Sequence, residues 1–257
     1  MRKTKIICTI GPASESEAVF TKMCKAGLNV ARLNFSHGNH EEHLKRIRTI
    51  RKVREELKLP IPIMLDTKGP EYRIGVFKDH RVTLADGQDF TFTTEDIEGD
   101  ESRVSVSYKG FAKDLRKGDR VLVNNGLVVC TVKEINGNDV LCRVDIGGEL
   151  SDRKSMNFPG RLMSNAFLSE QDKKDLLFGI EQDVDYVAAS FMSTKEDALE
   201  MRNFLDENGG QDIDIIAKIE NRSGVDNVES ISEVVDGIMV ARGDLGVEIP
   251  FVEVPAI

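Results

Sequence analysis

Several features that would place this chain in a specialised class are missing from it. None of its four cysteines, Cys8, Cys24, Cys130 and Cys142, sits in a CxxC pair, and no cluster of cysteine and histidine has the spacing of a zinc site. No stretch approaches the roughly 18 consecutive apolar residues of a membrane-spanning helix. The apolar run 6–10 is too short for a signal peptide. We therefore expect a cytoplasmic protein with reduced thiols.

An excess of positive charge is also missing. The chain has 44 acidic and 35 basic residues, which gives a formal net charge of -9. This balance argues against broad binding to nucleic acid or to an anionic membrane, but it is compatible with a local basic pocket for phosphates. With 257 residues, of which 40% are hydrophobic, the chain can bury one large core or two ordinary ones.

What is present begins as alternating strands and helices. Short apolar runs at 6–10, 30–35 and 61–65 predict buried strands, and the periodicity of 17–26 and 40–57 predicts amphipathic helices between them. Strands and helices that alternate with short links predict right-handed βαβ units and a parallel sheet.

The pattern changes between residues 76 and 158, where we expect no helix and where alternating runs predict short strands. These runs are 81–84, 90–93, 103–106, 121–123 and 127–129. Turn signals such as Asn125-Gly126 and Asn136-Gly137 separate strands in this region. We therefore predict a small antiparallel β domain inserted into the α/β one.

The α/β pattern returns after Ser169, which resembles the capping residue of a helix. The expected elements are a helix to about 180, a strand at 186–191, a helix at 194–208, a strand at 215–219, a helix at 225–234 and a strand at 237–241. The tail 246–257 has no expected partner element. Six parallel strands are two fewer than in an eight-stranded α/β barrel. A fragment of a barrel is favoured over a partner-dependent piece or a smaller open sheet.

Polar residues gather where the second and third strands end, and in a barrel that rim holds the active site. Alternation places Arg32, Asn34 and Ser36 on one side, which suits a phosphate beside a small cation, although ordinary turn residues explain the pattern equally well. Asp66 and Thr67 offer oxygen ligands for a monovalent cation, in a segment that also reads as an interdomain hinge.

The fifth and sixth strands end in charged residues too. Lys218 and Glu220 share one face, which suits a charge stabiliser and a ligand of a divalent metal; a buried structural ion pair is the alternative. Asp244 offers a second carboxylate. Gly243 would let backbone N–H groups approach a substrate carboxylate. Arg73, after the third strand, would add a cationic arm for phosphates.

Five motifs in this order resemble those of pyruvate kinases, in particular the bacterial branch. They are 4–12, 32–38, 65–71, 218–221 and 239–246. The resemblance runs along the whole chain and implies a TIM-type (β/α)8 barrel, here truncated after about six strands, with an inserted small all-β barrel that acts as a mobile lid. The implied divisions are 1–69 for the first part of the barrel, 70–159 for the lid and 160–257 for the second part.

The resemblance implies phosphoryl transfer from phosphoenolpyruvate to ADP, which gives pyruvate and ATP in the last step of glycolysis. By analogy with the family, Mg²⁺ (or Mn²⁺) is held by Glu220 and Asp244. The implied K⁺ ligands are Asn34, Ser36, Asp66 and Thr67. Glu71 stands where the K⁺-dependent members have glutamate, so K⁺ dependence is expected.

The substrate roles are implied in the same way. Arg32 and Lys218 are expected to bind the transferring phosphate, Lys218 to stabilise the enolate, and the backbone at Gly243 and Asp244 to hold the substrate carboxylate. The expected nucleotide-binding residues are Asn34, His37, Arg73 and Lys154. Full-length members of the family form homotetramers.

Two departures from the family bear on activity. The lid turn usually reads Asp-Asp-Gly, and here it reads Asn124-Asn125-Gly126, which removes two charges. The last two barrel strands and the C-terminal domain that family members carry do not follow. The alternative is therefore an inactive fragment that binds metal or nucleotide without turnover. A third reading, a phosphoenolpyruvate-using barrel with other chemistry, is disfavoured by the K⁺-site residues and the lid.

Overall fold

The computed structural model describes residues 3–250 and 252–257. The chain divides into two compact units, which are described separately. The first comprises Met1–Gly69, Phe167–Ile219 and Val228–Met239. The second comprises Pro70–Ala166, Glu220–Asn227 and Val240–Ile257.

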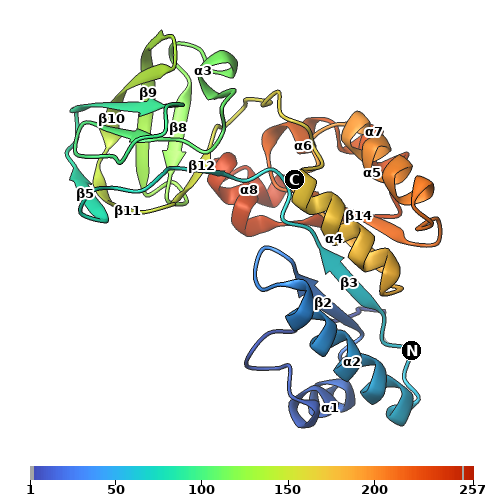
Figure 1. The fold of residues 1–257 in the computed structure, drawn as a ribbon. Helices are drawn as coiled ribbons and strands as arrows, with labels where there is room; N and C mark the ends of the chain where they lie inside the picture. The colour runs from blue at the N-terminus through green and yellow to red at the C-terminus, as the bar shows by residue number, and fades with distance from the viewer. Residues whose placement is uncertain (1–2, 251) are drawn as a thin grey trace. The chain divides into compact units, whose positions relative to one another are not determined.

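A parallel sheet forms the centre of the first unit (Figure 1). Its six strands, in spatial order, are β1 (Ile7–Thr9), β2 (Val30–Asn34), β3 (Ile63–Asp66), β13 (Tyr186–Ala189), β14 (Asp214–Ile219) and β15 (Gly237–Val240). Each pair of neighbouring strands from β1 to β14 is parallel. The prediction of three strands before the insertion and three after it is confirmed.

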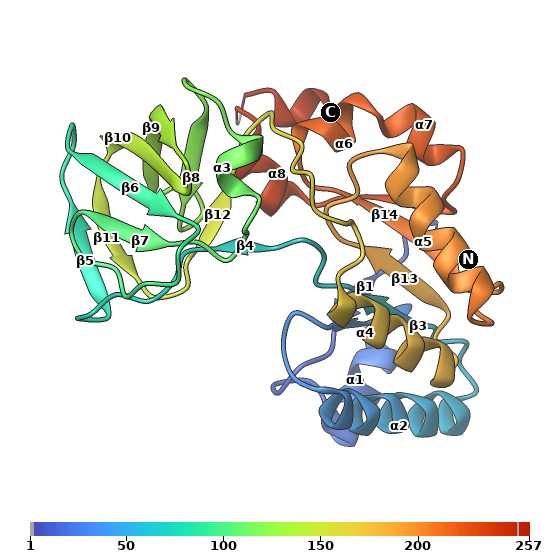
Figure 2. The same cartoon turned by 45° about the horizontal axis from the view of Figure 1, so that its top comes forward.

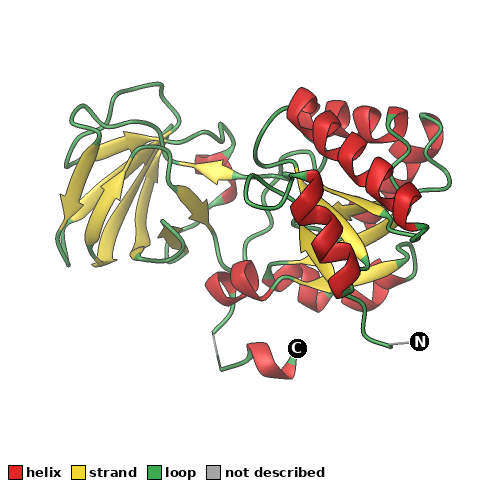
Figure 3. Ribbon diagram, turned by 90° about the horizontal axis from the view of Figure 1, so that it is seen from below, coloured by secondary structure: helices red, strands yellow, loops and turns green. Residues whose placement is uncertain are grey.

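Helices connect and flank these strands (Figure 3). They are α1 (Glu17–Ala26), α2 (His40–Leu57), α4 (Glu170–Glu181), α5 (Lys195–Glu207) and α7 (Val228–Ser232). Each long helix has a clear start: the Ser16 side chain accepts a hydrogen bond from Val19 N, and α4 and α5 begin with full capping boxes. The apolar stripe of α2 is buried.

Strands dominate the second unit (Figure 2). A seven-stranded sheet has the order β4 (Tyr72–Arg73), β12 (Ser155–Asn157), β8 (Arg120–Val123), β9 (Val128–Asn136), β10 (Asp139–Ile146), β6 (Asp89–Thr93) and β7 (Arg103–Ser105). A separate pair joins β5 (Arg81–Leu84) to β11 (Gly148–Ser151). The pairing is antiparallel except between β6 and β7, which run parallel. Phenylalanines fill the core between these strands.

The turn between β8 and β9 shows why its asparagines are tolerated. Asn124 and Asn125 have φ angles of 55° and 56°, and Gly126 follows at 80°. Asparagine enters this left-handed region more readily than most residues, and glycine enters it without steric cost. The Asn-Asn-Gly sequence therefore suits the local backbone, whatever charge it removes.

Three expectations about helices were wrong. The strand-rich segment contains a short helix, α3 (Phe111–Asp114), whose Phe111 is buried in the β core. The helix expected at 225–234 is two helices, α6 (Arg222–Asp226) and α7, separated at Asn227. The tail 246–257, expected to lack partner elements, contains the end of α8 (Arg242–Glu248) and a 3₁₀ turn, η1 (Val254–Ala256). Two glycines in α8 conceal it, because glycine is a poor helix former.

No helix in the described part of the chain is both long and apolar enough to cross a membrane. The four cysteines are free thiols, as expected, and Cys24, Cys130 and Cys142 are buried whereas Cys8 is half-buried. Burial raises the pKa of Cys130 to about 12 and also raises the pKa values of Cys24 and Cys142. The thiols of the β core are therefore protected both by access and by protonation.

We expect Cys130 and Cys142 to react with iodoacetamide at pH 8 at least about 100-fold more slowly in the native chain than in urea, because a raised pKa depletes the thiolate. Half-buried Cys8 serves as the internal control and should change far less. Site-resolved mass spectrometry measures each rate. Equal native and denatured rates at Cys130 would contradict the buried β core.

Glu248, at the end of α8, contacts the β domain within the second unit. Its carboxylate accepts hydrogen bonds from the Asn157 side chain and the Phe158 backbone N–H, yet burial outweighs both and raises its pKa to about 7. The folded chain therefore keeps a proton that the unfolded chain, with a pKa near 4.5, has released. The stability that this neutral carboxyl contributes is full below pH 4.5 and is lost as the pH rises to 7.

The wild type should lose stability as the pH rises from 5 to 7.5, because Glu248 gives up its proton in this range. We therefore expect the free energy of unfolding of Glu248→Gln to fall less than that of the wild type over the same range. One proton gives a slope of at most about 1.4 kcal/mol per pH unit. Urea unfolding of the wild type and the variant at matched pH values measures the difference, which should grow as the pH rises. A difference that is constant across this range would mean that Glu248 does not titrate there.

Candidate functional site

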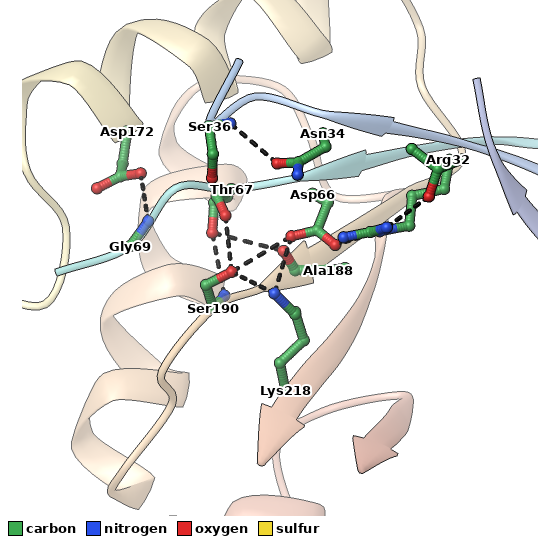
Figure 4. Close-up of polar contacts among 11 residues, drawn as sticks. Arg32, Asn34, Ser36, Asp66, Thr67, Gly69, Asp172, Ala188, Ser190 and Lys218 are labelled. Carbon is green, nitrogen blue, oxygen red and sulfur yellow. Dashed lines mark hydrogen bonds and ion pairs between the residues drawn. The ribbon is translucent and has the colours of Figure 1, made fainter. Parts of the chain in front are cut away.

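The carboxyl ends of four neighbouring strands in the first unit bring polar side chains to one edge of the sheet (Figure 4). The parallel register pairs Asn34 of β2 with Asp66 of β3, and Asp66 with Ala188 of β13. Ala189 in turn pairs with Ala217 of β14, the residue before Lys218. Side chains that are up to 184 residues apart in sequence, from Asn34 to Lys218, therefore meet because their strands end together.

Asp66 is the centre of this cluster. Its carboxylate is 1% exposed, and its Oδ1 accepts a hydrogen bond from Lys218 Nζ at 3.0 Å. Its Oδ2 forms an ion pair with Arg32 Nε. A buried carboxylate without a partner would be strongly destabilising, and here it has two cations. The three groups together carry a net charge of about +1, so they can attract an anion.

The clustering of Arg32, Asp66 and Lys218 agrees with the predicted rim. Arg32 also donates from Nη1 to the Thr9 hydroxyl of β1, so its guanidinium is held from two sides. Its side chain keeps 25% of its exposure, whereas Lys218 is buried. The Arg32 guanidinium is therefore partly exposed to solvent, whereas the Lys218 ammonium is buried at the edge of the sheet.

Ser190, at the end of β13, belongs to the cluster and was missed from the sequence. Its Oγ receives a hydrogen bond from Lys218 Nζ at 2.6 Å and donates to the Thr67 carbonyl at 2.7 Å. Its backbone N–H donates to the Thr67 hydroxyl at 3.0 Å. Ser190 therefore links the lysine to the β3 loop. The signal for it is the same as at the other strand ends, because Ser190 is a polar residue directly after the apolar strand β13.

The oxygen atoms around the β2 and β3 loops suit a cation of low charge. Asn34 Oδ1 accepts from Ser36 N at 3.0 Å, and Figure 4 shows the Ser36 side chain directed towards Thr67. Together with the Asp66 carboxylate these groups form a set of hard oxygen donors. Because Asp66 is already paired with two cations, the set has little negative charge left for a divalent ion. The donor chemistry therefore fits K⁺.

The loop between β2 and α2 carries His37, whose side chain is exposed. Its carbonyl is held by His43, which donates from Nε2 at 2.9 Å. His43 itself is 1% exposed, and burial lowers its pKa, so its ring stays neutral near neutral pH. Three of the chain's four histidines thus lie in or beside this loop.

The other predicted site residues belong to the second unit. Arg73 forms an ion pair with Glu71 and donates from Nη1 to the Arg153 carbonyl at 2.6 Å. The backbone carbonyl of Lys154 accepts from Ile74 N at 3.0 Å, which ties the residue to the strand that carries Arg73.

The predicted magnesium ligands differ in their surroundings. Glu220 is 1% exposed, whereas Asp244 lies exposed in the first turn of α8. A Cβ at Gly243 would meet no atom within 4 Å, so packing does not require glycine there. No group of three or more histidine, cysteine or acidic side chains in the described residues is placed to hold a metal. A magnesium site on these two carboxylates stays a prediction.

Comparison with known proteins identifies the family to which the chain belongs. The family model for the pyruvate kinase barrel domain matches residues 1–257. Among curated relatives, the pyruvate kinase of Clostridium acetobutylicum is 48% identical over 258 residues, which cover 100% of this chain and 54% of that protein. The pyruvate kinase of Staphylococcus haemolyticus is 48% identical over 259 residues, 100% of this chain and 44% of that protein. The chain spans about half the length of these relatives.

A match to the family model along the whole chain, and relatives at nearly half identity, agree with the rim of charged strand ends. This chain belongs to the pyruvate kinase family, as part of its α/β barrel domain.

Proposed function

We propose that the protein transfers the phosphoryl group of phosphoenolpyruvate to ADP, giving pyruvate and ATP, and that it requires Mg²⁺ and K⁺. The observation that carries the proposal is the Asp66 carboxylate held between Arg32 and Lys218, beside oxygen donors that suit K⁺. Phosphoryl transfer depends on positioning and on neutralising charge, which this cluster supplies in a fixed form.

Lys218 has the central catalytic role in this proposal. As the bond between phosphorus and the bridging oxygen breaks, the three-carbon fragment retains the electron pair as an enolate, which then takes up a proton at carbon to become pyruvate. An ammonium group fixed by Asp66 Oδ1 and Ser190 Oγ is oriented before the charge develops. Arg32 binds the phosphate oxygens, since a guanidinium matches their geometry.

The ions would complete the charge balance. Mg²⁺ on Glu220 and Asp244 would neutralise phosphate and enolate oxygens, and K⁺ would add one positive charge beside the phosphate. The K⁺ ligands in this proposal are Asn34, Ser36, Asp66 and Thr67. The backbone at Gly243 and Asp244 would hold the substrate carboxylate.

From the resemblance we propose that Asn34, His37, Arg73 and Lys154 bind the nucleotide and that the strand-rich segment acts as a mobile lid. In the family such closure excludes water from the transferring group, which protects it from hydrolysis. The cytoplasmic location, expected from the reduced thiols, and the homotetramer, implied by the resemblance, remain predictions.

The second candidate is binding without turnover. The observation that favours it is the share of the relatives that the chain covers, 54% and 44%. Residues that complete the active site in those relatives need not all be present in this chain. The two candidates share one binding site and differ only in catalysis.

We expect this chain to form pyruvate from phosphoenolpyruvate and ADP with Mg²⁺, and to do so faster with KCl than with tetramethylammonium chloride at equal ionic strength. A lactate dehydrogenase-coupled assay measures the rate. Thermal unfolding with phosphoenolpyruvate and Mg²⁺ is the companion measurement. Stabilisation without turnover would support the binding candidate, whereas neither stabilisation nor turnover would contradict both.

We expect Lys218→Met to lower turnover by at least about 10²- to 10³-fold, the usual cost of removing one group that stabilises developing charge. Binding of Mn²⁺, followed by electron paramagnetic resonance, should survive because Lys218 is not an expected metal ligand. Lys195→Met is the matched control, since Lys195 pairs with Glu233 on the surface. A Lys218→Met variant that folds and retains wild-type turnover would show that the role is wrong.

A further inference from the structure

Helix α4 lies against both loops that carry the proposed K⁺ ligands. We propose that Asp172 and Asp175 on this helix, together with His40, are positioning residues that set the spacing of the ligand oxygens and hence the preference for K⁺ over Na⁺. The inference rests on the proposed function, because it concerns the cation site of that reaction.

Asp172 connects α4 to the β3 loop (Figure 4). The carboxylate is 1% exposed, and its Oδ2 completes the capping box by accepting from Ser169 N at 3.1 Å. Its Oδ1 accepts from Gly69 N at 3.0 Å, two residues beyond the ligand Thr67. A capping box needs no such second bond. The Gly69 contact therefore serves the loop rather than the helix.

Gly69 is confined from its other side by Ser190. Its φ is +68°, and a Cβ there would lie 2.9 Å from both Ser190 Cβ and the Ser190 carbonyl oxygen. Ser190 in turn accepts from Lys218 and donates to the Thr67 carbonyl. The segment from Thr67 to Gly69 is thus held between α4 and the end of β13, and the direction of the Thr67 carbonyl follows from that.

Asp175, one turn along the same helix, connects α4 to the β2 loop. It is 2% exposed, and its Oδ1 lies 2.6 Å from His40 Nε2 and 2.8 Å from Gln171 Nε2. His40 begins α2 directly after the loop that carries Ser36 and His37. A carboxylate oxygen can only accept a hydrogen bond, so His40 Nε2 donates its proton to Asp175.

Aromatic packing fixes the same loop. Phe178 of α4 stacks on His40 with ring centroids 4.4 Å apart, and Phe35 stacks on His43 at 3.9 Å. His43 Nε2 then holds the His37 carbonyl, while its buried Nδ1 has no hydrogen-bond partner among the residues that the structure describes. Ring stacking and the His43 hydrogen bond thus anchor this loop at His40 and at the His37 carbonyl.

Asp172, Asp175 and Phe178 are spaced by three residues and lie along one face of α4, because side chains three or four apart are neighbours on a helix. This face meets the β3 loop at Gly69 and the α2 start at His40. Two of the proposed ligands, Asn34 and Asp66, end β2 and β3, and the other two, Ser36 and Thr67, lie in the loops that follow. Selectivity between cations depends on the size and rigidity of the oxygen cage, so the helix that joins the loops controls it.

The test measures cation binding on the intact chain without relying on turnover. Thermal unfolding is followed across titrations of KCl and NaCl, with tetramethylammonium chloride as the salt control. We expect a K⁺-specific rise in melting temperature for the wild type. Asp172→Asn and Asp175→Asn should raise the K⁺ midpoint about tenfold or more and reduce the preference over Na⁺, the usual effect of losing a group that orients metal ligands.

Glu170→Gln is the matched control, because it neutralises an acid on the same helix that pairs only at the surface, with Lys173. Its K⁺ midpoint should equal that of the wild type. His40 supplies a second pair of variants should the buried aspartates not tolerate change, since its side chain is 39% exposed. His40→Gln keeps a donor for Asp175 and should retain most of the K⁺ affinity, whereas His40→Ala should lose it.

Two outcomes would overturn the inference. Variants that lower the melting temperature equally in all three salts, with the K⁺ midpoint unchanged, would show that α4 only stabilises the fold. If KCl raised the melting temperature of the wild type no more than the other two salts, the chain would have no K⁺ site for these residues to shape. Stabilisation by phosphoenolpyruvate with Mg²⁺, measured on the same samples, keeps these failures distinct from failure of the proposed function.

Discussion

The site depends on one interaction, the buried carboxylate of Asp66 between two cations. Lys218 comes from β14 and Arg32 from β2, and both would repel each other at the edge of the sheet without Asp66 between them. The carboxylate in turn could not be buried without them. In the sheet β3 lies beside β2, and β13 separates it from β14, so Arg32 reaches Asp66 from the neighbouring strand and Lys218 reaches it across β13.

The parallel arrangement of the strands brings further polar residues to the same edge of the sheet as Asp66. Strands that run the same way end at the same edge, so a polar residue placed after each apolar run reaches its neighbours without any local signal. This is why the sequence sufficed to group Arg32, Asp66 and Lys218. Asp66 ends β3, and Arg32 and Lys218 lie within the last three residues of β2 and β14. The order of the apolar runs in the sequence matches the order of the strands in the sheet.

The residues that were not found from the sequence act in a different way. Asp172 reads as a capping residue and does cap α4, so its second bond to Gly69 leaves no trace in the sequence. Asp175 and His40 are 135 residues apart and meet only through packing of α4 beside α2. Helix α8 was missed because its glycines oppose helix formation, and only the folded context overrides that preference. The local sequence pattern therefore predicts which residues lie at strand ends. The contacts that helices make with distant segments become visible only in the structure.

The local charge of the rim explains how an acidic chain can bind an anionic substrate. The chain carries a formal charge of -9, which would disfavour phosphoenolpyruvate and ADP if it acted at long range. At physiological ionic strength charges are screened beyond about 8 Å, so the distant acids count for little at the rim. Within the cluster of Arg32, Asp66 and Lys218 the two cations exceed the carboxylate by one, and a monovalent ion in the adjacent oxygen cage would add a second positive charge. A monovalent ion also suits this place better than a divalent one, because the cage has no spare carboxylate to offset a larger charge before the substrate arrives. The number of acids at the rim, more than their total in the chain, therefore decides which ion and which substrate the site can hold.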